Sequence, residues 1–296
     1  NYLTIDSTVP LNNVTVDGTA TPKTVTMAVN NLTLQGNLVI NATSVFKADS
    51  MTVTIAGNLT NLNTDANAGV ATGGYRPGSI RQVTKFIGSI SNQTITGVTG
   101  NVTNFAMLVI DNTYNSGTVT LQTNTAVRVN GDLTLSHGTM ADGGNIITVI
   151  GDVSNSAVHS SSGIGRMLLA GPAVQYLSGN GTGKFGNLYL NALYDVRMIS
   201  AMEITGILTF QGATSINTGK LLDIGNKMLN LSNTSAASIV ALSPAVFSAT
   251  CCIRSDGLVS DAAVQKSYPA SSLDFTFPIG VPGKYTPARM NITANT

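Results

Sequence analysis

The chain has 296 residues, of which 43% are hydrophobic and 10% are charged, and its net charge is +1. A charge this close to zero, without a run of Lys or Arg, argues against nucleic-acid binding, which needs a basic stripe. No apolar stretch of about 18 residues occurs, so we predict no membrane span. Thr, Asn, Ser and Gly are abundant instead; they are poor helix formers but suit short strands joined by tight turns.

A short apolar strand, a Gly-Asn or Gly-Asp pair and a second short apolar strand recur along the chain. The pattern occurs at 32–40, 53–59, 127–135 and 147–153, and again around Gly206 and at 222–226. Within successive pairs the glycines lie 21, 20 and 19 residues apart. A fixed period near 20 residues is typical of a solenoid. We therefore predict an all-β fold, a right-handed parallel β-helix with about 20 residues per coil, with a β-sandwich array as the alternative.

The alternation within each strand predicts which side chains face inward. The aliphatic positions should fill the core and the interleaved Thr, Ser and Asn should face outward. The inward set includes Leu32, Leu34, Leu38, Ile40, Val53 and Ile55. The Gly-Asn and Gly-Asp pairs should form the corners, because Gly adopts positive φ without strain and Asn or Asp tolerates it. Stacked Asn side chains can form hydrogen-bonded ladders.

A longer period groups the coils into modules, because 105–112 aligns with 185–192, 80 residues later. We predict a β-solenoid over residues 1–245, made of three modules at about 11–92, 93–170 and 171–240. Module one contains an insertion at 61–92. Segments that project from a solenoid often bind ligands, although a capping excursion without a ligand is the alternative. The candidate surface-contact residues in this insertion are Tyr75, Arg76, Arg81 and Lys85.

The composition changes near residue 245. Four of the nine prolines and a cluster of aromatic residues fall in 246–296, where the Gly-Asn pattern stops. We predict a C-terminal non-solenoid β unit there, either the start of a next domain or a cap over the open strand edges of the solenoid. Cys251 and Cys252 should lie unpaired on opposite sides of a strand; a strained disulfide between them is the alternative.

An ordered series of motifs occupies this last segment. It reads DGLV at 256–259, VQK at 264–266, FTFPIG at 275–280 and GKYTPA at 283–288. After Gly-Asn strand repeats, this series resembles a segment of large secreted cell-surface proteins of the Bacteroidota, exported by the type 9 secretion system, which include gliding-motility and attachment adhesins. No sorting domain of those proteins is recognisable here, and we expect the chain to be a segment of a longer protein.

The resemblance carries implications for location, partners and modification. It implies an extracellular position at the surface of a Gram-negative bacterium, with secretion-system or outer-membrane anchoring proteins as partners. It also implies O-glycosylation of Ser or Thr that follows Asp. Ser7 and Ser50 are in this context and are the candidate O-glycosylation sites.

Few residues indicate catalytic chemistry. A glycosidase needs two carboxylates facing one cleft, but Asp132 and Asp152 fall on predicted corners, where a turn role explains them. His137 and His159 are isolated from metal-ligand spacings and are predicted to be solvated surface residues. The loop at 179–185 is similar to a phosphate loop but lacks its first Gly and the Ser or Thr that holds magnesium. We expect no catalytic site, no metal and no cofactor.

These observations predict a segment of a secreted cell-surface adhesin or filament. It would act as a rigid stalk that contacts surface glycans or solid surfaces during attachment or gliding. Two other classes remain open: a β-helix polysaccharide hydrolase or lyase, and a phage or fimbrial fibre in which the same rod would form a trimer or polymer.

Overall fold

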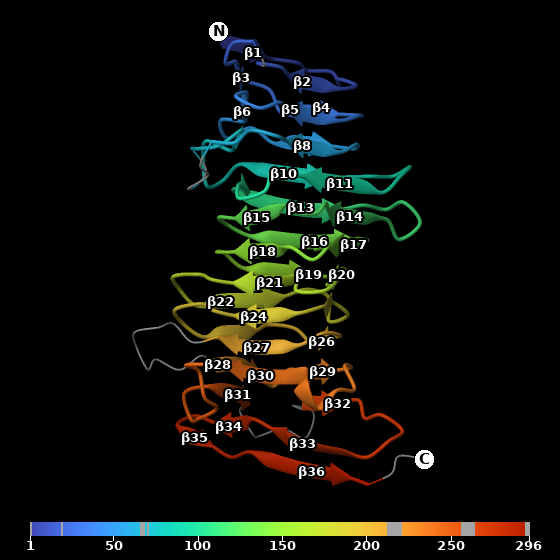
Figure 1. Cartoon of the computed structure of the whole chain (residues 1–296), viewed down its shortest axis with the longest axis vertical. Coiled ribbons are helices and arrows are strands. Elements are labelled where there is room, and N and C mark those ends of the chain that lie inside the picture. The colour runs from blue at the N-terminus through green and yellow to red at the C-terminus, as the bar shows by residue number, and fades with distance from the viewer. Residues whose placement is uncertain are drawn as a thin grey trace. The chain divides into compact units, whose positions relative to one another are not determined.

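The computed structural model describes residues 2–18, 20–65, 69, 71–211, 221–255 and 264–293. Within these ranges there is no α-helix, only the short 3-10 turn η1 (Ala236–Ser238), and no helix is long and apolar enough to cross a membrane. The chain forms two compact units, residues 1–151 with 157–166, and residues 152–156 with 167–296. Each unit is a stack of parallel β-coils (Figure 1), which confirms the predicted parallel β-helix.

In the first unit each complete coil contributes one strand to each of three sheets. Sheet A contains β1 (Tyr2–Ile5), β3 (Thr24–Met27), β6 (Val45–Lys47) and β9 (Tyr75–Arg76). Sheet D takes its place in later coils, with β12 (Val102–Phe105), β15 (Ala126–Val129) and β18 (Ile146–Val149). Sheet B contains β4 (Leu32–Leu34), β7 (Val53–Ile55), β10 (Val83–Phe86), β13 (Met107–Asp111) and β16 (Leu133–His137). Sheet C contains β2 (Val14–Val16), β5 (Leu38–Ile40), β8 (Leu59–Asn61), β11 (Gln93–Thr96), β14 (Thr118–Leu121), β17 (Thr139–Ala141) and β20 (Val158–Ser160).

The second unit has three parallel sheets of its own and ends in antiparallel strands. Sheet B′ contains β19 (Val153–Asn155), β22 (Gln175–Ser178), β25 (Val196–Met198), β28 (Leu221–Gly225), β31 (Cys252–Ser255) and β34 (Ile279–Val281). Sheet C′ contains β23 (Lys184–Phe185), β26 (Met202–Ile204), β29 (Leu229–Leu231) and β32 (Val264–Lys266). Sheet D′ contains β21 (Arg166–Leu169), β24 (Leu188–Leu190), β27 (Leu208–Gln211) and β30 (Ile239–Leu242). β35 (Lys284–Tyr285) pairs antiparallel with β34, and β33 (Leu273–Phe277) with β36 (Ala288–Ile292).

The coils recur about every 24 residues, rather than every 20 as predicted. The Gly-Asn spacing measures only the compact coils. Leu32 lies opposite Val53, but Val53 in turn lies opposite Thr84, because a long loop precedes β10. Such loops add residues between strands without changing the distance between stacked strands, which is set by backbone hydrogen bonds.

The predicted core is confirmed. The six aliphatic side chains expected to face inward are at most 2% exposed, and the residues between them in β4, β5 and β7 are only partly covered. Burial of one such side chain contributes about 1.5–3 kcal/mol, so the interior rows hold the coils together.

The corner glycines are needed for a different reason from the one predicted. Neither Gly36 nor Gly57 has a positive φ. A Cβ on Gly57 would lie 2.4 Å from the carbonyl carbon of Gly36 and 2.5 Å from its oxygen. Real Cβ contacts are not that short, so a larger residue would force the coils apart. Glycine is required because successive corners stack backbone on backbone.

The asparagines of the same corners form the predicted ladder. The backbone N–H of Asn37 donates to Asn13 Oδ1 at 2.7 Å, and that of Asn58 donates to Asn37 Oδ1 at 2.8 Å. The N–H of Thr94 then donates to Asn58 Oδ1 at 2.8 Å. Each side chain accepts from the backbone of the next coil, so the ladder joins successive coils outside the sheets.

The segment 61–92 is not a separate insertion, which corrects the prediction. It contains β9, which pairs in parallel with β6, and β10, which lies between β7 and β13. Both strands belong to an ordinary coil. Only the stretch between β8 and β9 is longer than in other coils.

The change of structure predicted at residue 245 occurs later in the chain. β31, β32 and β34 pair in parallel with β28, β29 and β31, so coil stacking continues to residue 281. The non-solenoid part consists of β35 and the β33–β36 hairpin. Within the motif series, 256–259 lies outside the described residues.

The rest of the motif series builds a cap. Lys266 lies opposite Leu231 in an inward row, and its Nζ is 5.2 Å from the ring centre of Phe275 and donates to the carbonyl oxygen of Asn233. Burial lowers the pKa of Lys266. The Phe275 ring meets the Phe277 ring edge-on at 4.8 Å. The Lys and Phe-x-Phe elements of the series therefore cover the last coil through cation–π and aromatic contacts.

The two cysteines are both unpaired and both buried, so the prediction of opposite sides is wrong. Cys251 is 5% exposed and Cys252 is 1% exposed. Cys251 forms an isolated bridge with Ser248 just before β31, and the tight turn between them covers its side chain. Burial, with a smaller contribution from Cys251, raises the pKa of Cys252 to about 11.

Candidate functional site

Tyr75 cannot contact a surface, which corrects the sequence prediction. Its side chain is fully buried, and its ring stacks on Phe46 at 5.9 Å and tilts against Phe105 at 5.5 Å. Its hydroxyl lies 2.7 Å from Thr84 Oγ1. Burial raises the pKa of Tyr75. The residue is a core anchor of the first unit, because Tyr75 occupies the inward position of β9.

The three basic candidates remain on the surface but do not form one site. Arg76 is partly exposed; its Nε donates to the carbonyl oxygen of Gly73 at 2.7 Å, and its guanidinium is 3.9 Å from Asp65. Arg81 and Lys85 are exposed, Lys85 on the outer face of β10. No interaction among the described residues joins these three side chains, and their contact role stays a prediction.

The two glycosylation candidates differ in access. Ser50 is exposed in a turn where both it and Asp49 have positive φ, 77° and 45°. Ser7 is half-buried, and its hydroxyl donates to the carbonyl oxygen of Val9 at 2.8 Å. Ser50 is therefore the more accessible acceptor, and modification of either residue stays a prediction.

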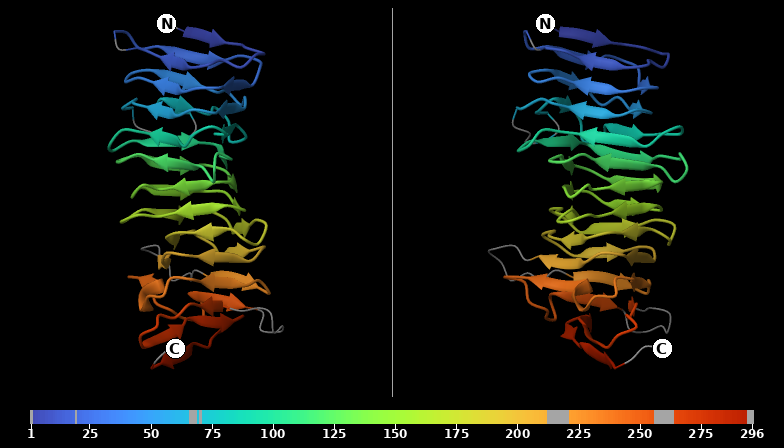
Figure 2. Two further views of the ribbon diagram at one scale, coloured as in Figure 1. Left: turned by 90° about the vertical axis from the view of Figure 1, so that its right-hand side faces the viewer. Right: turned by 45° about the vertical axis from the view of Figure 1, so that its right-hand side comes forward.

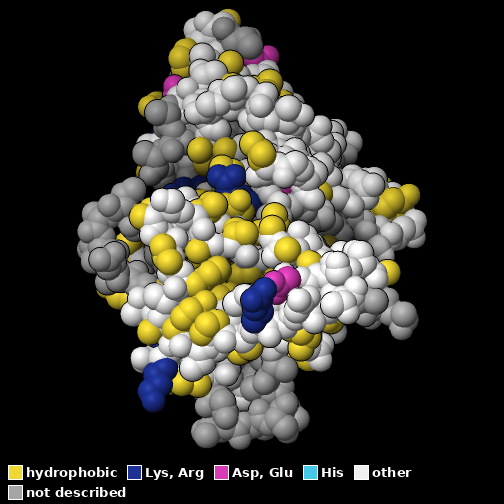
Figure 3. Space-filling model, turned by 60° about the horizontal axis from the view of Figure 1, so that its bottom comes forward, with side chains coloured by type: hydrophobic (Ala, Val, Ile, Leu, Met, Phe, Trp, Pro, Cys, Tyr) yellow, Lys and Arg dark blue, Asp and Glu magenta, His cyan; other side chains and the backbone are white. Residues whose placement is uncertain are grey.

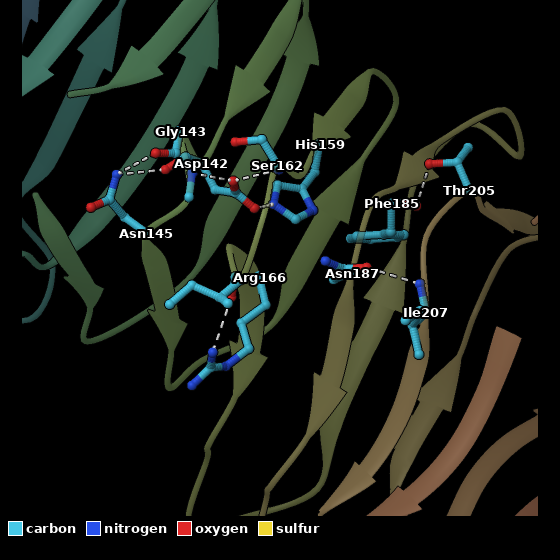
Figure 4. Close-up of polar contacts among 12 residues, drawn as sticks. Asp142, Gly143, Asn145, His159, Ser162, Arg166, Phe185, Asn187, Thr205 and Ile207 are labelled. Atoms are coloured by element: carbon cyan, nitrogen blue, oxygen red, sulfur yellow. Dashed lines mark hydrogen bonds and ion pairs between the residues drawn. The ribbon is translucent and has the colours of Figure 1, made fainter. Parts of the chain in front are cut away.

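Neither histidine is isolated, contrary to the sequence prediction. His137 Nδ1 lies 2.6 Å from Asp111 Oδ1 on the outer face of sheet B. His159 is fully buried, and its Nε2 lies 3.5 Å from Oδ2 of Asp142, which is also fully buried. Figure 4 shows these two side chains pointing toward each other. The sequence gave no sign of either pair, because the partners come from neighbouring coils.

Asp142 is held from several directions. Its Oδ1 accepts from the backbone N–H of Gly144 at 3.0 Å and of Ser162 at 3.1 Å. Burial acts to raise the pKa of Asp142, but the side chains of His159 and Ser161, together with these two N–H groups, outweigh it and leave the pKa below its usual value. The site is enclosed, so we assign it to structure rather than to ligand binding.

The strongest candidate binding site is on the outer face of sheet B′ in the second unit. In register across four strands, Tyr176 lies opposite Arg197, Arg197 opposite Asp223, and Asp223 opposite Arg254. Asp195 lies in the turn before β25, preceded by Tyr194. We call these six residues the Arg254 cluster: Tyr176, Tyr194, Asp195, Arg197, Asp223 and Arg254.

Ion pairs fix the charged members of the cluster. Arg254 donates to Asp223 Oδ2 at 2.5 Å, and the same nitrogen lies 3.9 Å from Asp195 Oδ2. Arg197 Nε is 3.8 Å from Asp223 Oδ2, and the N–H of Gly225 donates to Asp223 Oδ1 at 3.1 Å. The two arginines and two aspartates balance in charge and hold one another against the sheet.

The aromatic members of the cluster stay open to solvent. Tyr176 is 38% exposed and Tyr194 is 55% exposed. The Arg197 side chain is 44% exposed, so its guanidinium is also accessible. An aromatic ring beside fixed donors and acceptors is an arrangement that binds polar ligands with an apolar face.

Sequence reasoning missed this cluster because its members lie on separate coils. The signal that could have found it is the coil period itself: charged or aromatic residues at outward positions of successive strands in one sheet must be neighbours. The 20-residue period was too short to align them.

Other features of the second unit do not indicate chemistry. The loop at 179–184 is a corner: a Cβ on Gly179 would lie 2.0 Å from the carbonyl oxygen of Asn155. Beneath the C-terminal hairpin lies an apolar pocket of about 280 Å³. Figure 3 shows hydrophobic side chains gathered on this face. The pocket is lined by Ile224, Ile253, Ser255, Val264, Phe277, Ile279, Ala288 and Met290.

Among the residues that the structure describes, no group of three or more His, Cys, Asp or Glu side chains is placed to hold a metal ion. The chain matches no protein-family model, and no similar curated protein or solved structure was found.

Proposed function

We propose that the chain is a segment of a secreted cell-surface adhesin or filament that acts as a stalk and contacts surface glycans or solid surfaces in attachment or gliding. The Arg254 cluster is the observation that carries this proposal. It places two open tyrosines beside fixed arginines and aspartates on the outside of a stacked sheet. A solid stack of coils suits a stalk, because backbone hydrogen bonds run from coil to coil.

The cluster would recognise a glycan by two kinds of contact. A tyrosine ring stacks on the apolar face of a sugar, while guanidinium groups donate to its hydroxyls and carboxylates accept from them. Since the ion pairs already hold these side chains, binding loses less side-chain entropy. The balanced charge of the cluster favours a neutral glycan over an acidic one.

The motif series supports the proposed setting of this function. Its resemblance to Bacteroidota surface proteins places the chain outside a Gram-negative cell, with secretion-system or outer-membrane anchoring proteins as further partners. The cap that the series forms over the last coil fits this role, because a covered end cannot pair with stray strands.

One observation favours polysaccharide hydrolysis or lysis as a second candidate. Asp195 and Asp223 both face Arg254, and a glycosidase uses two carboxyl groups about 5–9.5 Å apart. Binding is the better supported function, because both carboxylates are already engaged by Arg254, and Asp223 also accepts from Gly225.

Binding to immobilised glycans tests the proposal. We expect Arg197→Ala and Tyr176→Ala to weaken retention on a neutral glycan about tenfold, the usual effect of removing an interface anchor. Lys85→Ala, an exposed position on sheet B of the first unit, is the matched control and should bind normally. Unchanged binding by both cluster variants would exclude the cluster as the site. Release of reducing ends or unsaturated products by the unmodified chain would favour the enzyme.

A further inference from the structure

Six threonines form a two-dimensional array on the outer face of sheet C in the first unit. Thr60 lies opposite Thr96, Thr94 opposite Thr120, and Thr118 opposite Thr139. These three pairs cross β8, β11, β14 and β17, whose side of the molecule faces the viewer in the left view of Figure 2. We call this array the Thr face: Thr60, Thr94, Thr96, Thr118, Thr120 and Thr139.

The Thr face is rigid, uncharged and chemically unoccupied. The residues between its threonines, such as Ile95, Val119 and Met140, are fully buried and fix the strands from below. None of the six hydroxyls bonds to another described group. This differs from Thr125, whose hydroxyl accepts from the N–H of Gly97 at 2.9 Å. The face is therefore built of regularly spaced hydroxyl and methyl groups that are free to meet a ligand.

The spacing of the array decides which ligand it suits. Stacked strands are about 4.7–4.9 Å apart, so the hydroxyls of each opposed pair are separated by about 4.8 Å. Two oxygens that bond to one shared water at about 2.8 Å, at a tetrahedral angle, lie about 4.6 Å apart. Each Thr pair thus reproduces the distance between next-nearest oxygens in a tetrahedral water lattice. The methyl groups between them cannot hydrogen-bond and leave that lattice undisturbed.

We propose that the Thr face binds ice. This inference goes beyond the proposed function and does not depend on it, because the face belongs to the other unit and takes a different ligand. A crystalline polysaccharide also presents a flat, repeating surface, but the face has no aromatic ring on which a sugar could stack. Ordered water fits an array that offers only hydroxyl and methyl groups.

Partition into slowly grown ice tests the proposal on the whole chain. The unmodified protein should be enriched in the ice fraction. Thr120→Lys and, separately, Thr96→Lys should lose that enrichment, because a long charged side chain interrupts the array. Thr134→Lys, on the outer face of sheet B, is the matched control and should keep it. Thermal unfolding of all four proteins identifies variants that fail to fold.

Three outcomes would overturn the proposal. The first is exclusion of the unmodified protein from ice. The second is an equal loss in folded Thr134→Lys and Thr120→Lys. The third is exclusion from ice combined with retention on crystalline cellulose that depends on Thr120, which would assign the face to a polysaccharide. Retention of neutral glycans by the Arg254 cluster is measured separately, so failure of one proposal does not imply failure of the other.

Discussion

The first unit holds two Asp–His pairs in opposite surroundings. Asp142 and His159 are both fully buried and 3.5 Å apart, whereas Asp111 and His137 are 39% and 66% exposed and 2.6 Å apart. The shorter contact is the weaker one energetically, because water screens exposed charges. A buried group that loses its partner cannot recover it from solvent. Burial, rather than distance, therefore decides how much each pair stabilises the fold.

The coil geometry explains how one unit creates both environments. His159 occupies the inward position of β20, opposite Met140, while Asp142 lies at the corner that follows β17. His137 ends β16 after a register shift that brings it opposite Asp111 on the outside. A shift by one residue exchanges the inner and outer faces of a strand.

Removal of the buried carboxylate should have the largest effect. Asp142→Ala leaves His159 and the N–H groups of Gly144 and Ser162 without an acceptor inside the unit. We expect a loss of about 3–5 kcal/mol in the free energy of unfolding, measured by urea denaturation. In a double-mutant cycle, Asp142→Ala with His159→Ala should lose less than the two single changes added together. A loss below about 1 kcal/mol would show that this pair does not stabilise the unit more than a surface pair does.

Crowding the same carboxylate should have an intermediate effect. A Cβ on Gly165 would lie 2.1 Å from Oδ1 and 2.4 Å from Cγ of Asp142. Gly165→Ala should therefore cost about 1–3 kcal/mol, the usual range for overpacking. Gly69→Ala is the matched control; its Cβ would meet nothing within 4 Å, and its effect should stay within about 0.5 kcal/mol. Equal stability of the two variants would mean that the corner relaxes freely.

Acid should separate the pairs further. The pKa of Asp142 is lower in the folded chain than its usual value. Its contribution is therefore complete above the unfolded pKa, about 3.9 for Asp, and is lost as the pH falls through the folded pKa. The free energy of unfolding should fall more steeply on acidification in the unmodified chain than in Asp142→Asn. Parallel pH profiles for the two proteins would contradict this assignment.

The sequence predicted what repeats and missed what does not. The alternation of Leu32, Leu34 and Leu38 identified the inward rows, and the Asn corners identified the ladder, because both recur in every compact coil. Tyr75 was misplaced because a loop of unusual length before β9 hid the inward phase of its strand. The Arg254 cluster and both Asp–His pairs were missed for one reason: their partners are a whole coil apart, and coil lengths vary with their loops.

The exposed pair should give the smallest effect and the clearest contrast. Asp111→Ala should cost less than about 1 kcal/mol at low salt, because both side chains remain hydrated when separated. Its effect should fade in about 1 M salt, where screening acts over about 3 Å, whereas the effect of Asp142→Ala should persist, since ions do not reach a buried group. Urea denaturation of both variants at the two salt concentrations measures this difference. If the two losses respond equally to salt, then water reaches Asp142 as readily as Asp111, and burial cannot be what distinguishes the pairs.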